Sequence, residues 1–303
     1  MTGNNNNRPP KWIRSIPRLT IEGRRKIIDD LHDDSKANFD YLILVALSST
    51  IATLGLLSDS PAVIIGAMVV APLMSPILAI GLATTTGEKK LLKEALLTLI
   101  VGALLSIVIS VILTWINDEL PFISLHQIPG EVMSRTRSSP VDLTIAIAGG
   151  FAAAYAVTRP KLSAALPGVA IATALMPPVC TVGIGLALQN WQVASGAGLL
   201  FVTNAVAIAF ASGLVFLARG FSKEQRFSES KIPVSLWVST VLVIFLLIPL
   251  SYFSLRVIRQ AEKTRMINTI VEREVALLPD VQLEEISFIN GSAVLDLRLT
   301  LHT

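Results

Sequence analysis

The stretch GAMVVAPLMSPILAIGLA, residues 66–83, is apolar enough to lie inside a membrane, yet it contains Pro72 and Pro76. Proline lacks a backbone donor and displaces the carbonyl four residues earlier, so it interrupts the hydrogen-bond ladder of a helix. The freed backbone groups then need partners from water, a bound solute, hydroxyl side chains or neighbouring helices. The stretch therefore predicts a broken membrane helix, which is either a packing kink or part of a polar site.

Composition places the whole chain in a membrane. Of its 303 residues, 52% are hydrophobic and 16% are charged, and a soluble domain has fewer of the first and more of the second. Several long windows contain no charged residue and are of the length that crosses the hydrocarbon core as a helix. These windows are 41–58, 96–116, 195–218 and 233–255. A shorter segment rich in Gly and Ala, 143–157, predicts a further span enclosed by other helices.

The second half of the chain repeats the pattern of the first. Residues 167–188, PGVAIATALMPPVCTVGIGLAL, again join an apolar run to prolines, Pro177 and Pro178, at an offset of about 104 residues. Each half then consists of a span, a proline-broken segment and a span. Three crossings are an odd number, so the two halves would have opposite orientations, as in the inverted repeats of transporters. Unrelated helices with a chance similarity are the alternative.

The placement of basic residues predicts an orientation. If the broken segments 61–84 and 162–188 cross the bilayer instead of returning to the same side, most Lys and Arg of the loops fall on one side. The positive-inside rule assigns that side to the cytoplasm. We therefore expect about seven spans in the inner or plasma membrane of a prokaryotic cell, with a cytoplasmic N-terminus and an outer C-terminus. The basic residues between Arg256 and Arg265 argue against that side for the C-terminus.

Three regions follow from these patterns. Basic and then acidic residues near the N-terminus predict an interfacial helix at 20–35. The acidic residues would repel nucleic-acid phosphates, so they argue against binding of a nucleic acid. The regions are a basic cytoplasmic segment at 1–37, a transmembrane domain at 38–258 with repeats at 38–116 and 141–219 and an extra span at 233–258, and an extramembrane part at 259–303.

The extramembrane part changes character. A charged amphipathic helix is followed by alternating apolar and polar residues around Asn290 and Gly291, a pattern that predicts a β-hairpin. A two-stranded hairpin is only marginally stable alone. We therefore expect a small α+β module that packs on its own helix or, in a homo-oligomer, on a second copy.

Polar residues near the breaks are candidates to bind a solute at the midplane, where the ends of half-helices present their dipoles. Asn204 lies within a span and serves either such a site or a contact between helices. The candidate substrate-binding residues are Pro72, Ser75, Pro76, Thr173, Pro177, Pro178, Thr181 and Asn204. A separate set of small residues at four-residue spacing predicts a face where helix backbones approach closely. That set is Gly102, Ser106, Ser110 and Thr114.

No ionisable residue falls in the centre of any predicted span, so a proton relay or a charged selectivity ring has no residues to use. His32, His126 and His302 are far apart, and no zinc-protease helix or nucleophile elbow is present. We therefore expect neither an enzyme nor a cofactor or metal site. The single cysteine, Cys180, cannot form an intramolecular disulfide.

Three stretches carry a family resemblance: SSTIATLGLLSDSPAVIIGAMVVAPLMSPILAIGLAT, ATALMPPVCTVGIGLAL and NAVAIAFASGLVFLARG. Over about residues 38–220 the chain resembles the bacterial and cyanobacterial uncharacterised hydrophobic-domain family, domain of unknown function 389. The resemblance implies an integral membrane protein of prokaryotes and no particular substrate. The sequence favours a transporter or channel-like protein for a small neutral or weakly anionic solute; a membrane-anchored sensor or scaffold is the alternative.

Overall fold

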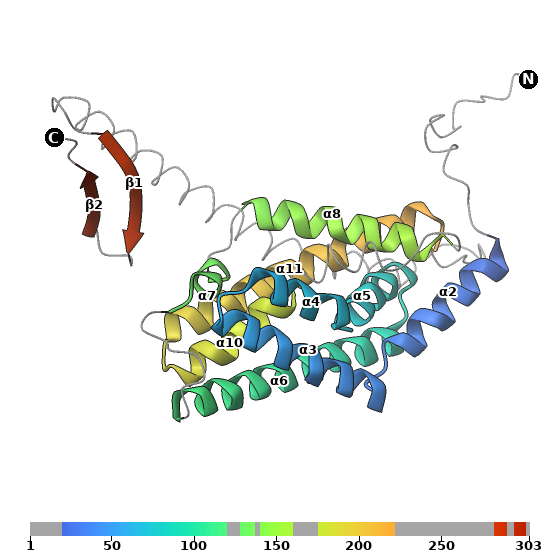
Figure 1. Cartoon of the computed structure of the whole chain (residues 1–303). Coiled ribbons are helices and arrows are strands. Elements are labelled where there is room, and N and C mark those ends of the chain that lie inside the picture. The colour runs from blue at the N-terminus through green and yellow to red at the C-terminus, as the bar shows by residue number, and fades with distance from the viewer. Residues whose placement is uncertain are drawn as a thin grey trace, which may run out of the picture. The chain divides into compact units, whose positions relative to one another are not determined.

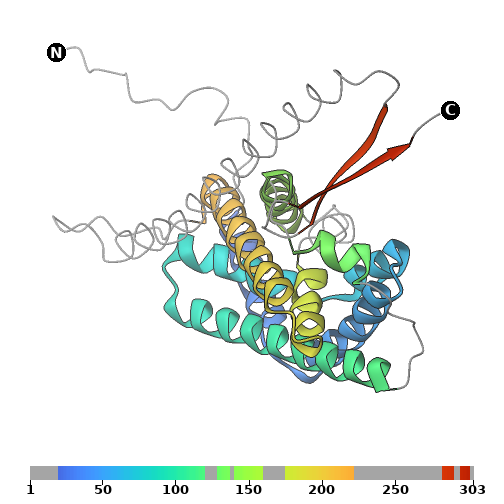
Figure 2. The ribbon, with the colours of Figure 1, turned by 90° about the vertical axis from the view of Figure 1, so that its left-hand side faces the viewer.

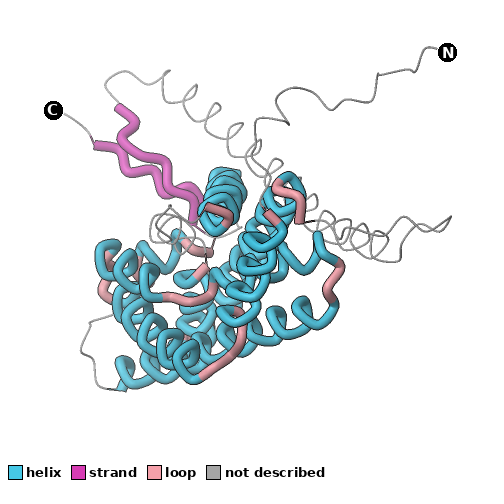
Figure 3. Tube along the Cα trace, turned by 90° about the vertical axis from the view of Figure 1, so that its right-hand side faces the viewer, coloured by secondary structure: helices cyan, strands magenta, loops and turns pink. Residues whose placement is uncertain are grey.

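The computed structural model describes residues 20–119, 128–136, 140–159, 175–221, 282–289 and 294–300. The chain divides into two units, Met1–Leu250 and Ser251–Thr303. The described part of the first unit is helical, and the second contains two strands (Figure 3). Thr173, the predicted span 233–255 and the predicted helix after it lie outside the described residues.

The helices of the first unit match most of the predicted spans (Figure 1). The charge-free windows 41–58, 96–116 and 195–218 lie largely within α3, α6 and α11. The helix predicted at 20–35 is present as α2. The helices are α2 Ile21–Asp34, α3 Phe39–Leu57, α4 Pro61–Val70, α5 Met74–Thr86, α6 Lys89–Glu119, α7 Gly130–Ser134, α8 Pro140–Val157, α10 Met176–Ala187 and α11 Trp191–Ala218.

Local sequence explains where these helices begin. Asn38 Oδ1 accepts a hydrogen bond from the Tyr41 amide at 2.8 Å at the start of α3, and Asn190 Oδ1 caps α11 in the same way through the Val193 amide at 3.2 Å. Such side-chain caps satisfy amides that have no partner inside the helix. Helix α4 instead starts with Pro61 in its first turn, where the missing donor costs nothing.

Helix α6 is amphipathic in the opposite sense to a helix of a soluble protein. Its buried face carries small and hydroxyl residues, and its exposed face carries large apolar ones. The buried set includes Gly102, Ser106, Ser110 and Thr114; the exposed set includes Leu97, Leu104, Val108, Ile112 and Trp115. Within the described residues three helices are long and apolar enough to cross a membrane, or four if the bent pair α4–α5 counts as one span. This arrangement indicates a membrane protein.

Helices α3 and α6 run in the same direction. Tyr41 Oη donates to the Thr98 carbonyl at 3.1 Å, and two further side-chain contacts between the helices, Ser49 with Ser106 and Thr53 with Ser110, keep the same 57-residue separation. The pair α4–α5, bent by 54°, therefore returns the chain to the end at which α3 began.

Helices α8 and α11 also run in the same direction, and α6 runs opposite to α11 (Figures 1 and 2). A Cβ on Gly150 of α8 would lie 2.8 Å from the Ile208 carbonyl of α11, so these helices pack backbone to backbone. The expectation that segment 143–157 is enclosed is wrong, because Ile145, Phe151 and Tyr155 of α8 are 46%, 40% and 41% exposed. Helix α8 uses its small residues against α11 and presents its large ones outward.

The second unit contains strands β1 Gln282–Ile289 and β2 Val294–Thr300, which pair antiparallel. The predicted turn at Asn290 and Gly291 falls between them, outside the described residues. The two strands pair in the antiparallel way that the predicted hairpin requires, with an irregularity in register between Leu283 and Glu285.

Candidate solute site at the helix breaks

Helices α5 and α10 begin in equivalent ways. Their N-cap residues, Leu73 and Leu175, are each 1% exposed, and neither helix start has a side-chain cap. The first helical residues, Met74 and Met176, are 102 residues apart (176 minus 74), so this spacing replaces the sequence-based offset of about 104. Each helix start carries a partial positive charge; the start of α10 is buried, and the start of α5 is partly exposed at Met74 and Ser75.

The prolines start these helices instead of interrupting them. Pro177 and Pro178 occupy the first turn of α10, and Pro76 occupies the first turn of α5. Amides of a first turn have no partner within the helix, so proline there frees no carbonyl of that helix. The expectation that these three prolines interrupt the hydrogen-bond ladder within a helix is wrong, because they lie in first turns. They reduce the number of N–H donors that a ligand could use at each helix start.

Pro72 alone lies in a true break. It follows Ala71, whose backbone is extended with ψ 122, the conformation that proline imposes on the residue before it. The break leaves the amides of Met74 and Ser75 in the first turn of α5, where no helical carbonyl is available to them. Ser75 and Pro72 are partly exposed, and Pro76 is buried.

Two close approaches fix the half-helices against the long helices, and they have the same 102-residue spacing. A Cβ on Gly81 of α5 would lie 2.1 Å from Ser212 Oγ of α11. A Cβ on Gly183 of α10 would lie 2.5 Å from the Ser110 Cβ of α6. Each half-helix thus packs against the last long helix of the other half of the chain.

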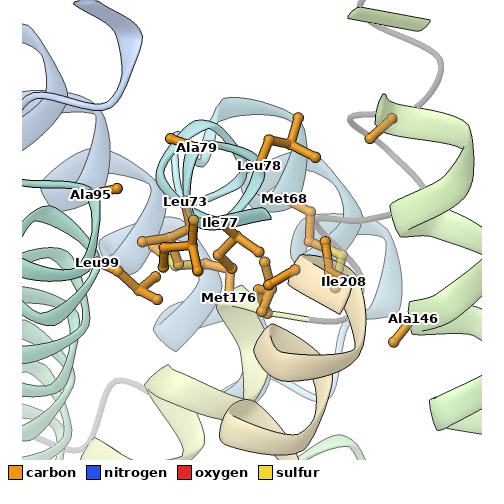
Figure 4. Packing of buried hydrophobic residues seen from close by; sticks show 14 of the residues in the cluster. Met68, Leu73, Ile77, Leu78, Ala79, Ala95, Leu99, Ala146, Met176 and Ile208 are labelled. Carbon is orange, nitrogen blue, oxygen red and sulfur yellow. The ribbon is translucent and has the colours of Figure 1, made fainter. Parts of the chain in front are cut away.

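Large apolar side chains fill the space where the half-helices meet. In Figure 4 the side chains of Leu73, Ile77 and Met176 lie together, with Met68 and Ile208 beside them. All five are buried. These apolar side chains therefore occupy the space beside the half-helix starts.

The hydroxyl of Thr181 is one of the buried side-chain polar groups that have no hydrogen bond among the described residues. Thr181 is fully buried in α10, and its Oγ1 forms no hydrogen bond with any described residue. An unsatisfied buried hydroxyl costs about 1–3 kcal/mol, so it needs a compensating role. Asn204 of α11 is buried as well. Ser75, Thr181 and Asn204 come from three different helices, α5, α10 and α11.

Hydroxyl side chains of α3 and α6 form a polar seam between these two helices. Ser49 Oγ donates to Ser106 Oγ at 2.9 Å, and Thr53 Oγ1 and Ser110 Oγ lie 2.7 Å apart. These hydroxyls are fully buried and satisfied. Cys180 of α10 joins the seam, with its Sγ 3.8 Å from the Ser49 carbonyl. The close approach predicted from the spacing in α6 is confirmed, and its partners are α3 and α10.

A family model described as "Domain of unknown function (DUF389)" matches residues 68–210, which include α5, α10 and most of α11. An uncharacterized protein of Methanocaldococcus jannaschii is 30% identical over 237 residues, which cover 76% of this chain and 71% of that protein. This relative is archaeal, so it does not support the bacterial or cyanobacterial origin implied by the resemblance. No solved structure matches the chain.

Proposed function

The chain belongs to the family of membrane proteins defined by the domain of unknown function DUF389, and we propose that it is a transporter or channel-like protein for a small solute. The observation that carries the proposal is the matched pair of buried half-helices, α5 and α10, which start without caps 102 residues apart. Discontinuous helices that meet near the midplane are the usual substrate site of transporters built from repeats.

Four further relationships support two inverted repeats, each of three helices. The close approach of Gly81 to Ser212 is repeated by Gly183 and Ser110, with both residues shifted by 102. Helices α3 and α6 are parallel, as are α8 and α11, and α6 and α11 are antiparallel (Figure 1). An inverted repeat of a span, a broken segment and a span predicts this set of directions.

The chemistry of the half-helix starts favours a neutral or weakly anionic solute. First-turn amides donate hydrogen bonds, and the helix dipole adds a partial positive charge. In the first two turns of α5 and α10, the hydroxyls are those of Ser75 and Thr181, and hydroxyls bind uncharged groups as well. No described Asp, Glu, Lys, Arg or His is present in α4, α5 or α10, and a strongly charged solute would lack a counter-ion there.

The expected topology completes the proposal. With α4–α5 and the segment 162–188 both crossing, the chain has about seven spans in a prokaryotic cell membrane, with the N-terminus in the cytoplasm. Trp115 near the end of α6 and Trp191 at the start of α11 are 62% and 74% exposed. Exposed tryptophans at this end fit the aromatic belt of the outer interface. We propose no enzymatic activity.

A membrane-anchored sensor or scaffold is the second candidate. The observation that favours it is the separate C-terminal unit with its hairpin, which needs a further packing surface and suits a homo-oligomer. Transport distinguishes the two functions, because a sensor need not move a solute.

The test is a flux measurement on the full chain in proteoliposomes. Stopped-flow light scattering would follow vesicle re-swelling with glycerol, urea, formate and acetate as probes. The proposal predicts faster entry of at least one probe than into protein-free vesicles of the same size. Entry of every probe at the protein-free rate would favour the sensor or scaffold.

A further inference from the structure

Three arginines converge where α8 and α11 end. Arg219 follows α11, Arg159 follows α8, and Arg24 lies in the first turn of α2. Arg219 donates from Nη2 to the Thr158 carbonyl at 3.0 Å, and Arg24 donates from Nη1 to the Gly220 carbonyl. These two hydrogen bonds bring the ends of three helices together around basic side chains.

An aromatic ring holds two of the guanidinium groups in place. The Cζ atom of Arg159 lies 5.4 Å from the centroid of the Tyr155 ring, and that of Arg219 lies 5.8 Å from the same centroid. Stacking on a ring orients a guanidinium without using its N–H donors. Tyr155 is 41% exposed, and Arg24 and Arg159 are partly exposed, so solvent reaches part of the arginine cluster of Arg24, Arg159 and Arg219.

Two positive charges of this arginine cluster, those of Arg159 and Arg219, lie close together on one ring. Burial, and then the positive charge of Arg159, lower the pKa of Arg219, a residue that is only 3% exposed. Neither Arg24 nor Arg159 forms an ion pair with a described carboxylate. Arg159 Nε is buried and makes no hydrogen bond with the described residues. A buried N–H donor without an acceptor costs free energy, and a bound anion would accept a hydrogen bond from Arg159 Nε.

We propose that Arg24, Arg159 and Arg219, with Tyr155, form a binding site for a phosphate group. Arginine matches phosphate oxygens with paired N–H donors, and basic pockets between membrane helices bind lipid headgroups. The site lies where the long apolar helix α11 ends, the depth of a headgroup. An acidic phospholipid and free phosphate share this chemistry. The inference does not depend on the proposed solute site.

The experiment titrates the full-length protein and follows its thermal unfolding. One arm adds phosphatidylglycerol to protein in phosphatidylcholine nanodiscs, and the other adds inorganic phosphate at constant ionic strength. The variants are Arg159→Gln and Arg24→Gln, with Lys93→Gln as the matched control, because Lys93 is an exposed lysine of α6 and its loss changes the net charge equally.

We expect phosphatidylglycerol to raise the unfolding temperature of the parent and of Lys93→Gln. The apparent affinity should fall about ten-fold in Arg159→Gln and in Arg24→Gln, the effect of one lost charge-assisted hydrogen bond. A response to inorganic phosphate that has the same arginine dependence would identify free anion as a ligand. If Arg159→Gln does not fold, Arg24→Gln decides. The proposal is overturned if neither ligand stabilises the parent, or if the arginine variants respond as Lys93→Gln does.

Discussion

Gly81 of α5 and Ser212 of α11 are so close that a Cβ on the glycine would lie 2.1 Å from Ser212 Oγ and 2.7 Å from the Ala209 carbonyl. The second of these atoms belongs to the backbone of a long helix and cannot rotate away. The contact between a half-helix and the opposite half of the chain therefore requires glycine. In a membrane, burial of apolar surface contributes little to the association of helices. Close packing through small residues is therefore an important source of stability.

Replacement of Gly81 by Ala should destabilise the protein by about 1–3 kcal/mol, because α5 and α11 must separate to admit the methyl group. Gly66→Ala is the matched control, since a Cβ there would meet nothing within 4 Å. Thermal unfolding of both variants in the same detergent measures the difference. Equal unfolding temperatures would contradict the close contact.

The repeat relationship makes a parallel prediction for Gly183. A Cβ there would lie 2.6 Å from the Ile107 carbonyl of α6, so Gly183→Ala should cost about as much as Gly81→Ala. The comparison uses the same unfolding measurement. A cost confined to one of the two variants would show that the contacts are not equivalent.

The hydroxyl seam predicts energetic coupling between α3 and α6. Ser49→Ala and Ser106→Ala each remove one member of the 2.9 Å pair, and the double variant should lose less than the sum of the single losses. Couplings of this kind between membrane helices average about 0.6 kcal/mol. A double-mutant cycle in denaturant measures the coupling, and strict additivity would mean that the hydrogen bond contributes nothing.

Much of the helical framework was predictable from sequence. Charge-free windows located α3, α6 and α11, because a charged residue at membrane depth is expensive. The four-residue spacing of Gly102, Ser106 and Ser110 identified the buried face of α6, since small residues mark helix contacts.

Contact partners and register could not be predicted. Large apolar residues face lipid and core alike in a membrane, so nothing in the sequence of α8 distinguished Phe151, which is exposed, from an enclosed residue. The short match IGLA suggested an offset of about 104, while the helix starts at Met74 and Met176 give 102. The satisfied state of Ser49 and the unsatisfied state of Thr181 depend on neighbours far away in the chain.

Topology is testable by accessibility. Cysteine placed at Lys90 should react with an impermeant maleimide only after cells are opened, and cysteine placed at Gln189 should react in intact cells. Both side chains are exposed, and the native Cys180, which is buried, would be replaced by Ala. Labelling of the Lys90 position from outside would show that α4–α5 or the whole domain has the other orientation.

The central claim is that the half-helices bind solute, and Thr181 offers the most direct test. Thr181→Val removes a buried hydroxyl that has no described partner, so the free energy of unfolding should stay equal or rise. Thr114→Val is the matched control, because Thr114 is equally buried but its hydroxyl donates to the Ser110 carbonyl at 2.7 Å.

The deciding measurement is the re-swelling rate of proteoliposomes that contain the parent, Thr181→Val or Thr114→Val, with a probe that the parent transports. The account predicts that Thr181→Val loses most of the protein-dependent flux while its unfolding temperature is unchanged or higher, and that Thr114→Val keeps the parental flux. Full flux through a stably folded Thr181→Val would contradict a solute site at the start of α10.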